Sequence, residues 1–340
     1  MSLPPSEIPL GAMRFNSDSQ KLEYYDGAQW LQVSTFSPLL NGGARGVFGG
    51  GDNGDGTLYN TIEYITISST GNTTDFGDFS GTRTILTACS SSTRGLFGGG
   101  YYNGTTDSNT IEFITISSTG NAADFGDLTQ FRRGANGCSN STRGLFSGGL
   151  TTTAPLTPIT WFNIIDYVTI ASIGNAVDFG DSTLARASVD AGCSSTTRGL
   201  WGGGQSPTQT NNIDYVTIAS TGNAQDFGDL TYGRGGSTAV SNSTRGVWAG
   251  GYSSSPKPNV IDFITISTLG NAQNFGDLTV ARWTIGGCSS QTRGVFGGGA
   301  PSTNLIDYIT ILTTGNAIDF GDLSQTRQRG SALSNAHGGL

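Results

Sequence analysis

The stretch Ala44-Arg45-Gly46-Val47-Phe48-Gly49-Gly50-Gly51 decides the fold of this chain, because near-copies of it follow at intervals of about fifty residues. The copies keep an arginine at the same point, at Arg94, Arg143, Arg198, Arg245 and Arg293. Two other words recur with this period, the strand-like Thr61-Ile62-Glu63-Tyr64-Ile65-Thr66-Ile67 and the short Asp75-Phe76-Gly77-Asp78. A period of roughly 20 to 50 residues is typical of repeat architectures. The sequence therefore contains six copies of one unit.

The second copy indicates what one unit contains. Four segments have the composition of β-strands, and turn or loop residues separate them; they are residues 83–90, 94–99, 110–116 and 122–128. A single four-stranded sheet leaves both of its faces uncovered, whereas sheets stacked around an axis cover one another. We therefore expect an all-β fold, with a six-bladed β-propeller of four antiparallel strands per blade over residues 44–340.

The two ends of the repeated region predict how the ring closes. The first copy begins with its second strand, at Arg45, and so lacks a first strand. The last residues, Arg329 to Asn335, match the first strand of other copies. The C-terminal segment is therefore expected to supply the missing strand of the first blade.

The four cysteines each stand five residues before a repeat arginine, at Cys89, Cys138, Cys193 and Cys288. Val240 and Leu333 occupy the same place in the other copies. A position that accepts Cys, Val or Leu is typical of a small apolar core site. We expect four buried thiols, with no disulfide and no metal bound to them.

Charged residues also recur with the repeat. An acid and an arginine stand five residues apart in every copy, as in Asp78 and Arg83. They predict a repeated ion pair or a backbone clamp at the connection between blades, and the arginine can also bind carbonyls of the adjacent blade. The alternative is a ring of six arginines around the channel mouth that binds an acidic sugar or a phosphate. The second arginine set, Arg45 to Arg293, is expected to pair with the acids of the third strands, Glu63, Glu112, Asp166, Asp214, Asp262 and Asp307.

Several function classes are disfavoured by what the sequence lacks. The net charge is −8 and there are only two lysines, so nucleic-acid binding is not expected. No apolar run is long enough to span a membrane as a helix. The single histidine, His337, stands in the tail, which leaves no set of ligands for zinc or copper and no His-based triad. We expect no catalytic residues, cofactor or metal. A glycosidase using two carboxylates stays open, and the loop Asp52 to Gly56 is read as a polar turn rather than a calcium site.

Variation between the copies gathers in the loops between second and third strands and in the connections between blades. Functional residues tend to lie on loops that a rigid scaffold holds, and exposed aromatic rings suit sugars and protein partners. The candidate binding residues are Tyr59, Tyr101, Tyr102, Phe131, Trp161, Phe162, Tyr232, Tyr252 and Trp283. The alternative is that several of these rings only cap the gaps between blades.

The first forty residues do not join the repeat. Residues 11–16, 21–25 and 28–33 are expected to form three strands, with a hairpin turn at Asp26-Gly27. Three strands are marginally stable alone, so this β-meander, residues 1–33, should dock on the propeller, on another copy of the chain or on a larger assembly. Residues 34–43 are expected to be a linker.

The repeat resembles the kelch repeat through its apolar-Gly-Gly word, its third-strand aromatic and the arginine that opens the first strand; Phe76 and its counterparts stand where kelch has Trp. The N-terminal segment resembles a meander of phage tail fibres, through Arg14-Phe15-Asn16-Ser17, Leu22-Glu23-Tyr24-Tyr25-Asp26-Gly27 and Trp30. The Ser-Thr-Gly-Asn-Ala-x-Asp-Phe-Gly-Asp-Leu words look like those of structural proteins of marine bacteriophages.

This resemblance implies a virion protein that is assembled in the host cytoplasm. Residues 1–43 would bind other virion proteins, and the propeller would recognise a host glycan or protein as part of a tail fibre. The alternative is a capsid or tail decoration protein whose propeller contacts other virion proteins. A polysaccharide-degrading enzyme is the third possibility, and assembly with further copies of the chain stays open.

Overall fold

The computed structural model describes residues 8–16, 21–32, 44–152, 159–188, 190–253 and 259–340, and these contain β-strands but no helix. The expected linker, residues 34–43, lies outside the described residues. The chain divides into two units, Met1–Asn41 and Gly42–Leu340. In the first unit, a three-stranded antiparallel sheet has the order β1-β2-β3, with strands β1 (Met13–Asn16), β2 (Lys21–Tyr25) and β3 (Trp30–Gln32).

Among the described residues, the second unit contains six four-stranded antiparallel sheets, which we number in chain order. Sheet 1 combines the two ends of the unit; its strands are β32 (Ser331–Ser334), β4 (Arg45–Gly49), β5 (Thr61–Thr66) and β6 (Thr74–Asp78). Sheet 2 contains β8 (Thr87–Ser90), β9 (Arg94–Gly98), β12 (Thr110–Thr115) and β13 (Ala123–Asp127). Sheet 3 contains β14 (Asn136–Ser139), β15 (Arg143–Ser147), β18 (Ile164–Thr169) and β19 (Val177–Asp181).

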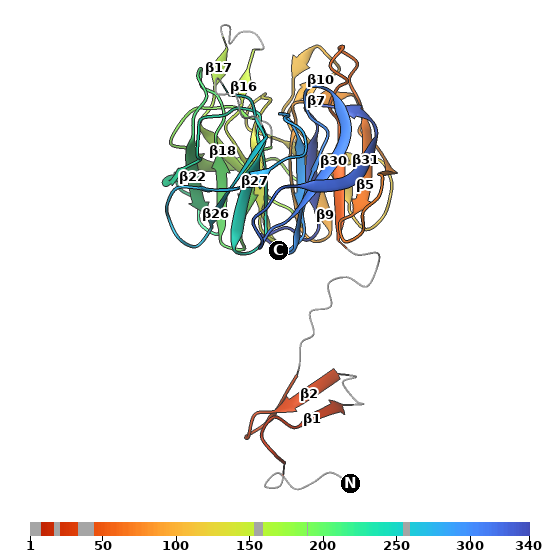
Figure 1. The fold of residues 1–340 in the computed structure, drawn as a ribbon, viewed down its shortest axis with the longest axis vertical. Helices are drawn as coiled ribbons and strands as arrows, with labels where there is room; N and C mark the ends of the chain where they lie inside the picture. Colours follow the sequence, from red (N-terminus) through yellow and green to blue (C-terminus); the bar gives the residue numbers. More distant parts are fainter. Residues whose placement is uncertain (1–7, 17–20, 33–43, 153–158, 189, 254–258) are drawn as a thin grey trace. The chain divides into compact units, whose positions relative to one another are not determined.

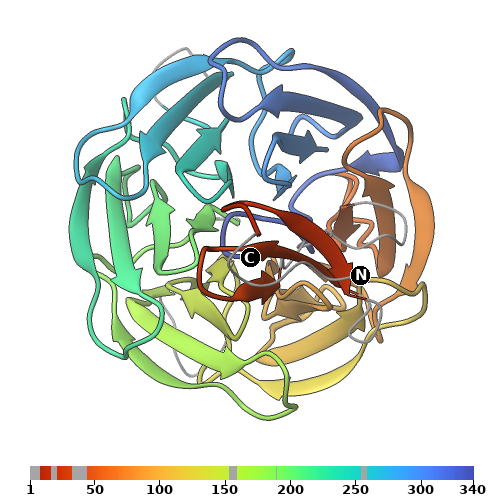
Figure 2. The same cartoon turned by 90° about the horizontal axis from the view of Figure 1, so that it is seen from below.

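The remaining sheets repeat this order. Sheet 4 contains β20 (Gly192–Ser194), β21 (Arg198–Gly202), β22 (Asn212–Thr217) and β23 (Gln225–Asp229). Sheet 5 contains β24 (Thr238–Ser241), β25 (Arg245–Ala249), β26 (Val260–Thr265) and β27 (Gln273–Asp277). Sheet 6 contains β28 (Gly286–Ser289), β29 (Arg293–Gly297), β30 (Thr303–Thr310) and β31 (Ile318–Arg327). Figure 2 shows the sheets around a common axis.

The expected first strand of each copy is shorter than the sequence suggested. Residues 83–90 split into β7 (Arg83–Thr84) and β8, because Ile85 between them has a left-handed backbone with φ of 57°. Four more short strands form in the variable loops, which the sequence did not predict: β10 (Tyr101–Tyr102), β11 (Thr106–Asp107), β16 (Leu150–Thr151) and β17 (Thr160–Trp161).

Serine side chains connect the inner strands in a closed circuit. The Oγ of Ser139 donates a hydrogen bond to the carbonyl of Ser90 in the preceding sheet, at 2.7 Å. The same bond, at 2.6–2.8 Å, recurs at Ser90, Ser194, Ser241, Ser289 and Ser334. Since Ser334 bonds to Ser289 and Ser90 bonds to Ser334, the circuit passes through β32 like any other strand. The C-terminal segment therefore supplies the inner strand of sheet 1, as expected.

The Gly-Asn turn of each sheet bonds to the outer strand of the sheet before it. In sheet 2, the Gly120 N–H donates to the carbonyl of Phe76, and Asn121 Oδ1 accepts the N–H of Asp78. The first and last sheets are joined in the same way, by Gly71 and Phe320. The turn and the Asp-Phe-Gly-Asp motif recur together because each forms one side of the same contact between neighbouring sheets.

The hydrophobic core lies between neighbouring sheets. One cluster combines Phe76 and Ile62 of sheet 1 with Phe97 and Ile114 of sheet 2. The cysteine position belongs to this packing: the Sγ of Cys89 lies 2.6 Å from where a Cβ on Gly144 of the next sheet would be, so that position has room only for glycine. All four cysteines are buried free thiols, as predicted. Burial raises the pKa of the Cys138 thiol to about 12.

Candidate functional site

The variable loops lie at one end of the second unit, and the chain enters and leaves this unit at the other end. In sheet 2, the turns at Ser91–Thr93 and Ser117–Asn121 share one end, because Arg94 pairs with Thr115. Gly98 and Ile111 pair at the opposite end, where the loop from Tyr101 begins. Figure 1 shows β10, β16 and β17 at the end away from the C-terminus. We call the loop-bearing end the variable face.

The nine candidate aromatics divide into three groups on the variable face. Four stack on arginines, with guanidinium-to-ring distances of 5.0–5.7 Å: Tyr59 on Arg327, Tyr101 on Arg133, Tyr102 on Arg83 and Tyr232 on Arg234. Phe131 is 56% exposed and Phe162 is half-buried. Trp161 and Tyr252 line a common depression, and Trp283 contacts the Tyr252 ring edge-to-face at 6.5 Å.

This depression, about 140 Å³ in volume, is lined by residues of five sheets. Because these sheets lie around a common axis (Figure 2), we call it the axial mouth. Its base is formed where the chain enters the inner strands of five sheets, at Ile85, Gly134, Ser188, Gly236 and Thr284. Backbone hydrogen bonds join these entries around the axis, such as Gly134 N–H to the carbonyl of Ile85 at 2.9 Å and Ser188 N–H to the carbonyl of Gly134 at 2.8 Å. Leu150, Trp161, Gln205, Tyr252 and Arg133 form the wall.

Arg133 is the charged residue of this wall, and a carboxylate fixes it. Its Nη1 lies 2.9 Å from Oδ1 of Asp107, and its guanidinium stacks on Tyr101. The other oxygen of Asp107 accepts hydrogen bonds from the Thr151 hydroxyl and the Thr152 N–H, both at 2.8 Å. Asp107 thus joins the loops of sheets 2 and 3 and compensates the charge of Arg133. Sequence reasoning missed Arg133, Ser188 and Gln205, because they stand beside repeat positions without forming a motif.

The predicted ion pair between the acid and the arginine five residues apart is wrong, whereas the predicted arginine clamp on backbone carbonyls is present, as in the bonds from Arg132 to the carbonyls of Ile164 and Phe146. Each of these arginines is buried and pairs instead with the acid in the third strand of the sheet it enters, at distances of 2.5–3.3 Å; the pairs are Arg83–Glu112, Arg132–Asp166, Arg186–Asp214, Arg234–Asp262, Arg282–Asp307 and Arg327–Glu63. The arginines therefore do not form an open ring at the channel mouth. Asp78 is only part-buried, and its backbone N–H takes part in the sheet-to-sheet contact.

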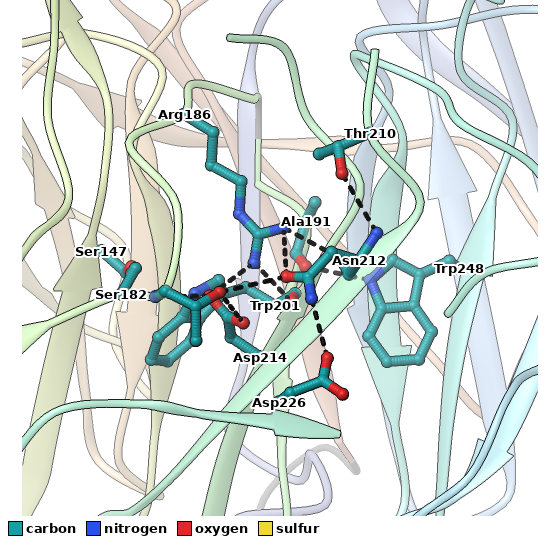
Figure 3. A network of polar contacts seen from close by, with 11 residues as sticks. Ser147, Ser182, Arg186, Ala191, Trp201, Thr210, Asn212, Asp214, Asp226 and Trp248 are labelled. Atoms are coloured by element: carbon teal, nitrogen blue, oxygen red, sulfur yellow. Dashed lines mark hydrogen bonds and ion pairs between the residues drawn. The ribbon is translucent and has the colours of Figure 1, made fainter. Parts of the chain in front are cut away.

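Sheet 4 shows how each buried pair is held (Figure 3). Arg186 Nη2 lies 3.0 Å from Oδ2 of Asp214 and donates to the carbonyl of Trp201, while Nη1 donates to the carbonyl of Asn212 at 2.8 Å. Asp214 also accepts the hydroxyl and the N–H of Thr183, at 2.6 and 3.1 Å. Burial lowers the pKa of the Arg186 guanidinium, and Asp214 opposes this change. These charges are therefore part of the structural framework.

The second prediction about arginines is also wrong. Arg45 and its five counterparts do not pair with the third-strand acids, which the first set occupies. Arg45 Nη1 donates to the carbonyl of Ile116 in the next sheet at 2.9 Å, and its guanidinium lies over the Tyr64 ring. The last copy repeats this contact across the junction, from Arg293 to the carbonyl of Ile67 at 3.1 Å. These six arginines connect neighbouring sheets.

The loop at Asp52 is a polar turn, as predicted. Asp52 Oδ1 accepts the N–H of Gly54, and its carboxylate accepts hydrogen bonds from Thr84 and Gln328 of the neighbouring sheets. Its oxygens are therefore engaged by donors rather than free for a cation. Across the residues that the structure describes, no three His, Cys, Asp or Glu side chains are grouped as metal ligands.

One copy of the repeat contains an extra residue, close to the common axis of the sheets. Arg186 and Cys193 are seven residues apart, whereas Arg132 and Cys138 are six apart. At this point Asp190 reaches the inner strand of sheet 1, where its Oδ2 accepts the Ser331 hydroxyl at 2.8 Å and the Ala332 N–H at 3.0 Å. Burial raises the pKa of Asp190 to about 7, although these donors partly oppose the change.

The C-terminal tail reaches the axis from the other end. His337 and Asp190 both line an axial cavity of about 50 Å³. His337 Nδ1 accepts the N–H of Gly339 and Nε2 lies 3.0 Å from the carbonyl of Ser90, which fits a neutral ring protonated at Nε2. Burial lowers the pKa of His337 to about 4. Ser139, 3.3 Å from this ring, has its hydroxyl engaged on Ser90, so the group is not arranged as a nucleophile and base.

These two groups make opposite contributions to the pH dependence of stability. Between pH 4 and 7 folded Asp190 keeps a proton that the unfolded chain releases, so its contribution to the free energy of unfolding falls as the pH rises. His337 stays neutral in the folded chain down to pH about 4, so its contribution rises with pH between 4 and 6.5. We expect Asp190→Asn to make stability rise more steeply over this window than in the unaltered chain, and His337→Gln to make it fall.

Chemical denaturation at a series of pH values measures these slopes. The two variants should diverge by a few kcal/mol across the window, because one pKa unit corresponds to about 1.4 kcal/mol. Parallel stability curves for the two variants and the unaltered chain would contradict the assignment of either group.

Comparison with protein families and with curated proteins found no match. No protein-family model matches the chain, and no curated protein matches its sequence. Within the described part of the chain, no helix has the length and apolar character needed to cross a membrane.

Proposed function

We propose that Gly42–Leu340 is a kelch-like six-bladed β-propeller in a bacteriophage virion protein, and that its variable face recognises a glycan or protein on the host surface. Support for the propeller comes from six sheets of four antiparallel strands, with sheet-to-sheet hydrogen bonds that return from sheet 6 to sheet 1. The repeated residues form these contacts between sheets. The residues that differ between copies are left to carry specificity.

The observation that carries this proposal is the position of the axial mouth relative to the ends of the unit. Arg45, where the chain enters, bonds through its N–H to Asn335 near the C-terminus, at 2.8 Å. The axial mouth lies at the other end of the sheets and presents aromatic and polar side chains from several loops. The mouth therefore lies at the end of this unit opposite to the point where the chain enters it. Such a depression on a rigid scaffold is typical of binding sites.

The N-terminal unit supports attachment to another virion protein. Register places Met13, Phe15 and Tyr24 on one face of its sheet, and Met13 and Phe15 are 61% and 66% exposed. On the other face, Arg14 bonds to Glu23 and stacks on Trp30. Because three strands have little stability alone, an apolar face of this kind favours docking on a partner.

Competition for phage adsorption tests the proposal. The purified 340-residue chain, added to host cells before the phage that encodes it, should reduce adsorption in a dose-dependent way. Unchanged adsorption, together with antibody labelling at many symmetry-equivalent capsid sites, would favour a decoration protein instead. Release of reducing sugar from host envelopes would favour an enzyme.

A further inference from the structure

We propose that the axial mouth binds a single uncharged pyranose unit, such as the terminal residue of a surface glycan. This inference rests on the proposed recognition function and specifies the ligand of the same face. Four features of the mouth carry it: an apolar wall with aromatic rings, a buried hydroxyl without a partner, a compensated charge and a small volume.

The wall of the mouth suits one face of a sugar ring. Trp161 and Tyr252 contribute aromatic rings, and Leu150 and Ile85 contribute aliphatic surface. The Tyr252 ring is held in place, because its hydroxyl bonds to Oε1 of Gln205 and Trp283 packs against its edge. The C–H face of a pyranose is apolar while its rim carries hydroxyl groups, so it needs an apolar wall beside polar partners.

Polar partners are present at the base and the rim. Ser188 is 6% exposed, lines the mouth, and its Oγ has no hydrogen-bond partner among the described residues. A buried hydroxyl without a partner is costly, and a ligand hydroxyl that bonds to it removes this cost. Arg133 has five N–H donors, of which the bond to Asp107 engages one. Both residues can therefore bond to sugar hydroxyls.

The electrostatics of the mouth favour an uncharged ligand. The one cation of the wall, Arg133, already has Asp107 at 2.9 Å, so its charge is compensated. The chain carries a net charge of −8, which repels anions approaching from solution. The described lining residues of the mouth include no unpaired cation that could bind an acidic sugar. They also include no carboxylate that could bind a cationic sugar.

The size of the mouth limits the ligand to one ring. Pockets for drug-sized molecules measure roughly 300–1,000 Å³, whereas the axial mouth has about 140 Å³. The rest of a glycan would extend away from the mouth over the surrounding loops. A single ring with few contacts is expected to bind with a dissociation constant in the millimolar range, and affinity on a virion would come from many copies.

Saturation-transfer NMR on the 340-residue chain tests this inference, with glucose, galactose, mannose and N-acetylglucosamine as probes and glucuronate as the acidic control. At least one neutral sugar should receive saturation and bind more tightly than glucuronate. Trp161→Ala should weaken its binding about tenfold, and Ser188→Ala about fivefold, as expected for loss of one hydrogen bond. Ile173→Ala, which removes an exposed apolar side chain from the turn at the opposite end of sheet 3, is the control and should change nothing.

Three results would overturn the inference: no transfer to any neutral probe, preference for glucuronate, or binding unaffected by both Trp161→Ala and Ser188→Ala. Its failure is distinguishable from failure of the proposed function. If the chain blocks phage adsorption but binds none of these sugars, recognition stands and the ligand is of another class. If a sugar binds in the mouth while adsorption is unaffected, the sugar site stands and host recognition does not.

Discussion

Deletion of Arg329–Leu340 is expected to abolish cooperative folding of Gly42–Leu340 and to give an aggregating product. The deletion removes β32, which is the inner strand of sheet 1 and pairs with β4 from Ser331 to Ser334. The serine circuit then opens on both sides of Ser334, and the buried side chains of Ala332 and Leu333 are lost. The edge of β4 would expose a row of unpaired backbone groups, which promotes association between chains.

Thermal unfolding and size-exclusion chromatography measure this effect. If the truncated chain stayed monomeric and kept its melting temperature within about two degrees, the ring would not depend on the C-terminal strand. A milder test of the same strand is Leu333→Ala, which should lower the free energy of unfolding by about 2 to 5 kcal/mol because it removes buried side-chain atoms from the core. Leu340→Ala, at the half-buried last residue, serves as its matched control and should lower the free energy of unfolding much less.

Asp214→Asn is expected to lower the free energy of unfolding by about 3 to 5 kcal/mol, because removal of one partner leaves Arg186 as an uncompensated buried charge. Both side chains are at most 1% exposed, and the Nε of Arg186 already lacks a hydrogen-bond partner. The loss should appear in chemical denaturation as a lower midpoint with an unchanged slope.

Asp226→Asn provides the matched control for this prediction. Asp226 lies on the adjacent strand β23 of the same sheet, is exposed, and accepts one hydrogen bond from Asn212 (Figure 3). Its replacement should change stability by no more than about 0.5 kcal/mol. Equal effects of the two substitutions would mean that the buried pair is not a major part of the framework.

Much of the strand architecture could be predicted from the sequence, because the repeated words correspond to local structure. The diglycine word ends β9, where Gly99 has a φ of 62° and its missing Cβ leaves room for the carbonyl of Arg132. The alternation of cysteine with Val240 and Leu333 indicated a small buried position, and all four thiols are buried. The match of Arg329–Asn335 to a first strand indicated the pairing of β32 with β4.

The partners of the arginines could not be predicted, because sequence spacing gives no information on which strand lies opposite a side chain. Arg83 is five residues from Asp78 but pairs with Glu112, on the third strand of the sheet that Arg83 enters. Arg45 faces a carbonyl of the next sheet, and a carbonyl leaves no signature in a sequence. The axial mouth was missed for the same reason, since its lining comes from single residues of several copies.

Asp190 shows a signal that was present but not interpreted. The spacing from Arg186 to Cys193 is one residue longer than in the other copies, and this irregularity places a carboxylate on the axis. Departures from a repeat are therefore as informative as the repeat. His337 could not be placed from sequence, because its position depends on contacts of the tail with the strand ends, such as Gly338 N–H with the carbonyl of Ser241.

The central claim is that the repeated residues hold the ring while the axial mouth performs recognition. Adsorption competition with Trp161→Ala, compared with Ile173→Ala at equal concentrations of folded protein, tests it most directly. We predict that Trp161→Ala keeps the melting temperature of the unaltered chain but loses most of its ability to block phage adsorption, while Ile173→Ala retains both. A Trp161→Ala chain that blocks adsorption as well as the unaltered chain would contradict the claim.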